Sequence, residues 1–294
     1  AVVWYCGQFY AMYFLGSTLR IDATTTQLVI AAALLIGTPF FVVFGWLSDK
    51  IGRKPVVLAG CLLAALTYFP IFQGLTHFGN PAIEAASASA PITVVADPAD
   101  CHLQINLTGT SVFTSSCDIA KSTLAKRGVP YTNEAAPAGS VARVTVGGAS
   151  VDSFDGSALP KAEFAAQSKA FGASLGGVLD QAGYPAKAAP ANSNYPMLIL
   201  LLFLLVLYVT MVYGPIAAWL VEMFPTRIRY TSMSLPYHIG NGWFGGFLPS
   251  VSFGIVALTG NIYSGLWYPV VIAMMTFVIG LFFVRETKDV DITA

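Results

Sequence analysis

Polar and aromatic side chains stand inside long apolar stretches of this sequence, where they could line a path for a solute. Tyr237 and Asn241 are four residues apart, so a helix would place them on one face with His238 beside them. A polar group at membrane depth is costly unless it faces a cavity or a partner helix, and Gln8 would therefore need one of these groups, or water. The candidates for a substrate pathway are Tyr5, Gln8, Tyr213, Tyr237, His238, Asn241 and Trp243.

Two interpretations of these residues stay open. In the first, they line a solute pathway between the first, fourth and fifth apolar stretches. In the second, they only form hydrogen bonds between helices and pack their rings against one another.

Catalytic chemistry has little support in the sequence. The three histidines, His77, His102 and His238, are far apart in the chain, and none belongs to a zinc-protease motif. Phosphate-binding loops and CxxC pairs are also absent from the sequence. We therefore expect no enzyme, no catalytic residues, no metal site and no cofactor.

The composition indicates an integral membrane protein. Hydrophobic residues make up 55% of the 294 positions and charged residues only 10%, against about 25% in an ordinary soluble domain. The net charge is zero, which argues against a nucleic-acid partner. Sixteen of the thirty charges, seven basic and nine acidic, fall in residues 77–195, so a water-exposed module interrupts a membrane body.

Six stretches are long enough to cross a bilayer, which takes about 20 apolar residues. They are residues 1–19, 26–47, 56–76, 196–221, 232–258 and 263–284. Lysine and arginine in short loops mark the cytoplasmic side. One side has seven such residues and the other has only Arg20, so the sequence predicts cytoplasmic termini and an external insert at 77–195. We also expect the chain to begin inside a longer protein, since no initiator methionine is present.

The insert resembles a small α+β module. We expect strands at 92–95, 103–107 and 141–146, helices at 117–127 and 161–180, and a flexible linker at 80–91. On an external, oxidising side, Cys101 and Cys117 are a candidate disulfide pair, although two unpaired thiols remain the alternative. Cys6 and Cys61 lie in spans and are expected to pack there.

A charged segment between the second and third spans carries the clearest motif. It reads Gly45-x-Leu47-Ser48-Asp49-Lys50-x-Gly52-Arg53-Lys54, between stretches 23–44 and 56–76 that contain no charge. It resembles the signature loop of the major facilitator superfamily, which follows the second helix and recurs after the eighth. Glu222-Met223-Phe224-Pro225-Thr226-x-x-Arg229 resembles the motif that ends the tenth helix. Residues 285–289 resemble the tail motif after the twelfth, with Arg285 and Asp289 departing from it.

The order of these motifs implies the C-terminal half of a twelve-helix transporter. The resemblance assigns residues 1–76 to helices seven to nine, 77–195 to a periplasmic insert, and 196–294 to helices ten to twelve and a cytoplasmic tail. The expected partners are therefore a six-helix N-terminal half, the lipid bilayer and a small-molecule substrate. Residues 230–249 are similar to the bacterial metabolite:proton symporter, or sugar-porter-like, branch, which imports dicarboxylates, citrate, shikimate and proline or betaine.

The resemblance implies a secondary active transporter in the bacterial inner membrane, with H⁺ as the coupling ion. Its motif residues here are Gly45, Asp49, Gly52, Arg53, Lys54, Glu222 and Arg229. Asp49, Arg53, Glu222 and Arg229 could form a cytoplasmic charge cluster that closes a gate, or they could be four solvated loop charges. The alternative function is a membrane-anchored sensor that uses the insert without transport.

Overall fold

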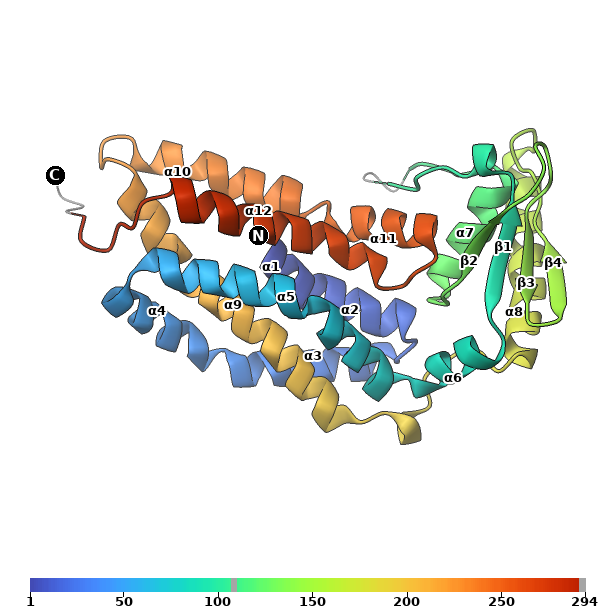
Figure 1. Cartoon of the computed structure of the whole chain (residues 1–294), viewed down its shortest axis with the longest axis horizontal. Coiled ribbons are helices and arrows are strands. Elements are labelled where there is room, and N and C mark those ends of the chain that lie inside the picture. The colour runs from blue at the N-terminus through green and yellow to red at the C-terminus, as the bar shows by residue number, and fades with distance from the viewer. Residues whose placement is uncertain (107–109, 291–294) are drawn as a thin grey trace.

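The computed structural model describes residues 1–106 and 110–290 and is mostly helical. Long helices form a bundle, and a module of helices and strands lies at one end of it (Figure 1). The opposite end holds the turn between α4 and α5 and the C-terminal tail (Figure 1). The insert and the charged motif are thus at opposite ends of the bundle.

Five helical stretches among the described residues are long and apolar enough to cross a membrane. They are Ala23–Ile51, Arg53–Gly79, Tyr195–Met223, Arg229–Thr259 and Ser264–Phe283. The first predicted span, 1–19, is helical from Val2 to Thr18, in alternating α and π turns: α1 (Val2–Tyr5), η1 (Cys6–Tyr10), α2 (Ala11–Tyr13) and η2 (Phe14–Thr18). This helix is shorter than the other five, so the count of six spans stays a prediction.

The bundle is organised around two long helices, α5 (Arg53–Gly79) and α9 (Tyr195–Met223), which pack against each other. The helices α3 (Ala23–Gly37) and α4 (Pro39–Ile51) cover α9, and α12 (Trp267–Phe283) covers α5. The fifth predicted span contains α10 (Arg229–His238), the π turn η5 (Ile239–Gly245) and α11 (Leu248–Thr259), and the 3-10 turn η6 (Ser264–Leu266) precedes α12. Apolar side chains such as Phe14, Phe72, Leu202 and Leu205 are fully buried between these helices.

The charged segment 45–55 is not the loop that the sequence suggested. The helix α4 continues to Ile51 and α5 begins at Arg53, so only Gly52 lies outside a helix. The corner at Gly52 places Ser48 and Asp49, in the last turn of α4, close to Arg53 at the start of α5. The motif is therefore a rigid corner between two helices.

The insert folds as an α+β module with a four-stranded sheet in the order β2-β1-β3-β4. Its strands are β1 (Ile92–Ala96), β2 (Thr132–Ala135), β3 (Arg143–Val146) and β4 (Ala149–Asp152). The helix α7 (Ser116–Lys126) connects the parallel strands β1 and β2, while β3 runs antiparallel to both β1 and β4. With α8 (Lys161–Gln181), α7 and the sheet enclose a second core that contains Val94, Leu124, Val144 and Leu175.

Several details of the insert differ from the sequence prediction. The predicted linker 80–91 contains the helix α6 (Pro81–Ser89), because Pro81 can start a helix and the alanines that follow favour one. Residues 103–106 form no strand, and residue 107 lies outside the described residues. The exposed strands β2 and β4 were missed, since their polar residues carry no apolar alternation. Short 3-10 turns occur at η3 (Pro98–Asp100) and η4 (Pro190–Asn192).

The insert is held together and fixed to the bundle by specific bonds. Cys101 and Cys117 form a disulfide, with 5.2 Å between their Cα atoms. Tyr131 donates from its backbone N–H to the carbonyl of Gly260 at 2.9 Å and from its hydroxyl to that of Ala257. Asn133 donates to the carbonyls of Leu258 and Thr259 at 3.2 Å each. These four carbonyls end α11, so the module supplies the partners that a helix C-terminus lacks.

Candidate functional site

Gly52 alone forms the corner between α4 and α5. Its φ is 112°, in the region that residues with a side chain rarely adopt. A Cβ atom at this position would collide with the carboxylate of Glu286 in the C-terminal tail. Both the backbone geometry and the approach of the tail therefore require glycine here.

Arg53 is the first residue of α5 and bridges three helices. Its side chain is 10% exposed, and its Nη2 is 3.0 Å from Oε1 of Glu222 near the end of α9. Its Nη1 is 2.5 Å from Oδ1 of Asp49 in α4 and donates to the Ser48 hydroxyl at 3.3 Å. Asp49 is 64% exposed and Glu222 only 11%. The pair with Glu222 is therefore the buried one, where unpaired charge would be costly.

Glu286 caps the N-terminus of α5. Its carboxylate accepts hydrogen bonds from the backbone N–H groups of Arg53 and Lys54, at 2.9 Å each. The same carboxylate accepts from the N–H groups of Thr287 and Lys288, at 2.9 and 3.0 Å. The first N–H groups of a helix have no partner within it, and the helix dipole favours an anion there.

The environment of Glu286 changes its acidity. Partial burial raises the pKa of this carboxyl, but the four backbone N–H donors lower it, and the net result is a pKa below the usual value. The charged form of Glu286 is thus the one that the folded protein stabilises.

The tail also provides a hydrogen-bond donor to the second carboxylate oxygen of Glu222. The hydroxyl of Thr287, a buried residue, donates to Oε2 of Glu222 at 2.7 Å. We call Asp49, Arg53, Glu222, Glu286 and Thr287 the charge cluster. It joins the ends of α4, α5 and α9 to the tail that follows α12.

Lysines of the same region complete the contacts between the motif and the tail. Lys54 Nζ donates to the carbonyls of Leu281 and Val284, at 2.8 and 2.9 Å, at the C-terminal end of α12. Lys288 Nζ donates to the carbonyl of Lys50 at 3.1 Å. A cation at a helix C-terminus is favourable, so Lys54 stabilises α12 as Glu286 stabilises α5.

The two remaining motif residues have other surroundings. Arg229 donates from Nε to the carbonyl of Phe224 at 3.1 Å, across the turn that joins α9 to α10. Gly45 lies within α4, and a Cβ atom added to Gly214 of α9 would be 3.3 Å from its backbone nitrogen. The structure thus joins Asp49, Arg53 and Glu222 directly, Arg229 forms a bond across its own turn, and Gly214 lets α9 approach the backbone of α4 at Gly45.

A second group of candidates lies within the spans. The Tyr213 hydroxyl of α9 donates to Oδ1 of Asn241 in η5 at 2.7 Å, and Asn241 Nδ2 donates to the carbonyl of Tyr237 at 3.0 Å. Trp4 packs edge-on against Tyr213, with 4.5 Å between the ring centres. The first, fourth and fifth predicted spans therefore meet at the Tyr213–Asn241 hydrogen bond.

The other pathway candidates are more scattered. Tyr5 packs against Gly245 of η5, where an added Cβ atom would collide with its ring. His238 Nδ1 bonds the carbonyl of Ser234 in its own helix at 2.7 Å, and Trp243 is 68% exposed. Gln8 is half-buried in η1, and no hydrogen bond links it to Asn241 or His238 in the described part of the chain.

The histidine, cysteine and carboxylate side chains are spread over the structure. Residues 1–106 and 110–290 contain no group of three histidine, cysteine or carboxylate side chains that could hold a metal ion. His102 pairs through Nδ1 with Asp118 at 2.8 Å, next to the disulfide of the insert. The His102–Asp118 contact is therefore interpreted as a structural contact within the insert.

Two sequence profiles of known protein families match this chain, one over each of its membrane parts. The sequence profile of the "Major Facilitator Superfamily" matches residues 3–91, and that of "Sugar (and other) transporter" matches residues 170–294. No solved structure matches the chain with significance. The two profiles contain all members of the charge cluster between them.

Curated relatives match over shorter stretches. A "Putative metabolite transport protein" of Haemophilus influenzae is 38% identical over 102 residues, which are 33% of this chain and 22% of that protein. A "Putative proline/betaine transporter" of Staphylococcus haemolyticus is 31% identical over 88 residues, 30% of this chain and 19% of that protein. A "Putative proline/betaine transporter" of Staphylococcus aureus is 40% identical over 62 residues, which are 21% of this chain and 13% of that protein. The chain thus spans about a fifth of the relatives that it matches.

Glu286 and Thr287 are the site residues that sequence reasoning missed. Both lie in the tail motif 285–289, whose similarity to a known motif was the only signal. Nothing in the local sequence indicates that this motif folds back onto a corner 233 residues earlier.

Proposed function

We propose that this chain, which belongs to the major facilitator superfamily, forms the second six-helix half of a secondary active transporter for a small hydrophilic metabolite. The observation that carries the proposal is the charge cluster, in which Arg53 joins Asp49 and Glu222 while Glu286 caps α5. It ties the ends of four bundle elements together at one side of the membrane. A bundle fastened in this way moves as one body, as alternating access requires.

The charge cluster is the proposed cytoplasmic gate of this half. Arg53, Glu222 and Thr287 are largely buried there and bond within this half, so the cluster keeps this end of the half in one piece. Rocking against a first six-helix half would make and break contacts around this corner. Removing one partner of a buried pair is costly, so loss of Arg53 or Glu222 would loosen the surface that closes against the other half.

The proposed orientation places the charge cluster in the cytoplasm and the insert in the periplasm of a bacterium. The positive loops surround the cluster at one end of the bundle, while the disulfide lies in the module at the other end (Figure 1). A disulfide is stable on an oxidising side of a membrane, which supports the external placement of the insert.

The proposed substrate is an organic acid or a zwitterion, and H⁺ is the proposed coupling ion. Tyr213 and Asn241 provide uncharged hydrogen-bonding groups where three spans meet, suited to a hydrophilic solute. Two of the relatives are named for proline and betaine, both of which are zwitterions. Proton coupling rests on the resemblance to metabolite:proton symporters.

Uptake measurements test this function. The chain is expressed alone, and together with a first six-helix half of a relative, in a bacterial strain that lacks its own proline, betaine and dicarboxylate carriers. We expect uptake of at least one of these labelled solutes with both halves, abolished by a protonophore. Uptake no higher than that of the empty strain for every solute would reject the proposal, and uptake that resists the protonophore would reject proton coupling.

A further inference from the structure

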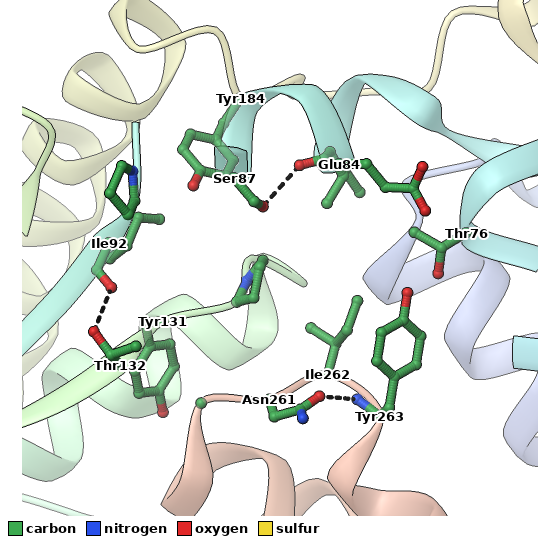
Figure 2. Close-up of a pocket in the computed structure, with 14 residues that line it drawn as sticks. Thr76, Glu84, Ser87, Ile92, Tyr131, Thr132, Tyr184, Asn261, Ile262 and Tyr263 are labelled. Atoms are coloured by element: carbon green, nitrogen blue, oxygen red, sulfur yellow. Dashed lines mark hydrogen bonds between the residues drawn. The ribbon is translucent and has the colours of Figure 1, made fainter. Parts of the chain in front are cut away.

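A cavity lies at the junction between the insert and the membrane bundle. Its volume is about 330 Å³, within the range of small-molecule sites. Figure 2 shows that it is enclosed by α6 on one side and by the turn at Asn261 and Ile262 on the other. The end of α5 and residues 130–132 of the insert complete it. This site is separate from the Tyr213–Asn241 hydrogen bond and from the charge cluster.

The walls of the cavity are mainly apolar and aromatic. Aliphatic and proline side chains cover much of it: Ile83, Pro91, Ile92, Pro130 and Ile262. Tyr131 and Tyr184 are buried and use their hydroxyls elsewhere, as donors to the carbonyls of Ala257 and Ala90. Their hydroxyls are therefore occupied, and at 6% and 3% exposure the two residues present small areas of ring to the cavity.

Among the described residues that line this cavity, Glu84 is the only acidic or basic one. Its carboxylate lies on the same side as Thr76 and the hydroxyl end of Tyr263 (Figure 2). One carboxylate oxygen is 3.0 Å from Nδ1 of His77, which leaves the other oxygen for a further partner. The Glu84 side chain is 42% exposed, so water screens its attraction for a cation in part, while the apolar walls beside it strengthen that attraction.

The chemistry of these groups selects the kind of cation. A metal ion needs several oxygen, nitrogen or sulfur ligands, and the described residues provide no cluster of three such side chains. A methylated ammonium group, in contrast, is bound by aromatic faces together with a single counter-charge. Three tyrosines, at positions 131, 184 and 263, line the cavity with Glu84.

We propose that the cavity between α6 and the α11–α12 turn binds a small organic cation of the methylated ammonium class. Glu84 is its counter-ion, and the rings of Tyr131, Tyr184 and Tyr263 form its walls. The ligand would touch both the insert and the ends of the bundle helices, so its binding would stabilise their contact. This role is independent of transport.

Choline and its uncharged analogue 3,3-dimethyl-1-butanol test the proposal, since they have the same shape and differ in charge. Binding of each to the purified chain in detergent micelles is measured by calorimetry and by thermal unfolding. We expect choline to bind and to raise the unfolding temperature, and the alcohol to bind at least tenfold more weakly. Equal binding of the two compounds, or binding of neither, would overturn the proposal.

Two pairs of variants locate the site. Glu84→Gln should weaken choline binding at least tenfold, whereas Glu163→Gln, which removes an exposed carboxylate of α8 outside the cavity, should not change it. Tyr263→Phe keeps the ring and should retain binding, while Tyr263→Leu should lose it. Unchanged choline affinity in folded Glu84→Gln, or equal affinity in the two Tyr263 variants, would contradict the assignment.

Discussion

The carboxylate of Glu286 occupies the space that a side chain at Gly52 would need. It accepts hydrogen bonds from the next two backbone N–H groups, those of Arg53 and Lys54. The glycine corner, the start of α5 and the C-terminal tail are therefore one structural unit, although they lie at opposite ends of the sequence.

Gly52→Ala should destabilise this unit. The new methyl group would displace the Glu286 carboxylate, and alanine would be strained at a φ of 112°. We expect a loss of about 1–3 kcal/mol in the free energy of unfolding, measured in detergent micelles.

Gly45→Ala is the matched control for this substitution. Gly45 belongs to the same motif, lies within α4, and has no atom within 4 Å of the position of an added Cβ. Alanine favours a helix over glycine by about 1 kcal/mol, so this variant should be at least as stable as the parent. Equal destabilisation by the two substitutions would argue against the Gly52–Glu286 relationship.

The lowered pKa of Glu286 makes the attachment of the tail depend on pH. A carboxyl whose pKa is lower in the folded state stabilises that state above its unfolded pKa, and the stabilisation is lost as the pH falls through the folded value. The difference in stability between the parent and Glu286→Gln should therefore be constant above about pH 5 and shrink below it. Since Glu286 is exposed, we expect the difference to stay below about 1 kcal/mol.

Thermal unfolding of the two proteins at a series of pH values measures this dependence. Taking the difference between parent and variant removes the contribution of the other carboxyl groups. A difference that grows as the pH is lowered would show that protonated Glu286 is the stabilising form, contrary to the structure.

The two ion pairs of Arg53 should differ in strength. Glu222 is 11% exposed and Asp49 is 64% exposed, so water screens the second pair much more. Double-mutant cycles with Arg53→Gln, Glu222→Gln and Asp49→Asn measure the two coupling energies. We expect less than about 1 kcal/mol for Arg53–Asp49 and a larger value for Arg53–Glu222. The reverse order would contradict the buried position of Glu222.

Sequence patterns predicted those parts of the structure that depend on neighbours in the chain. The pairing of Asp49 with Arg53 was suggested by their closeness in the motif, and the buried strand β3 follows from alternating apolar residues. The contact of Glu286 with Gly52 could not be predicted in this way, because it depends on how α12 returns to the start of α5. The sequence grouped Arg229 with Asp49, and the structure gives Arg229 a bond to the carbonyl of Phe224 in its own turn.

The insert also contains features that could not be predicted from the sequence. The segment of helix α6 was predicted to be a linker, because alanine and serine are common in linkers as well as in helices. Its packing against the end of α5 favours the helix, and this contact cannot be seen in the sequence. The π turns of the first and fifth predicted spans also left no signal in the apolar pattern. Asn241, which accepts the hydrogen bond of Tyr213, lies in one of these turns.

Arg20 connects the first helix to the insert at an energetic cost. Its φ is 60°, the only positive φ of a non-glycine residue in ranges 1–106 and 110–290. Its guanidinium donates to the carbonyls of Lys126 and Arg127 at 3.2 Å each, at the C-terminal end of α7. Its own carbonyl accepts from the N–H of Ala188 at 3.0 Å, where the chain returns to the bundle.

Arg20→Ala and Arg20→Gly separate the two contributions of this residue. Both remove the guanidinium, which should loosen α7 and speed proteolysis of the insert, but only glycine relieves the backbone strain. Arg20→Ala should therefore be less stable than Arg20→Gly by about 1–2 kcal/mol, as measured by thermal unfolding. Lys187→Ala, which removes the exposed cation next to Ala188, should leave stability and proteolysis unchanged. If the alanine variant were as stable as the glycine variant, the strained backbone at Arg20 would be excluded.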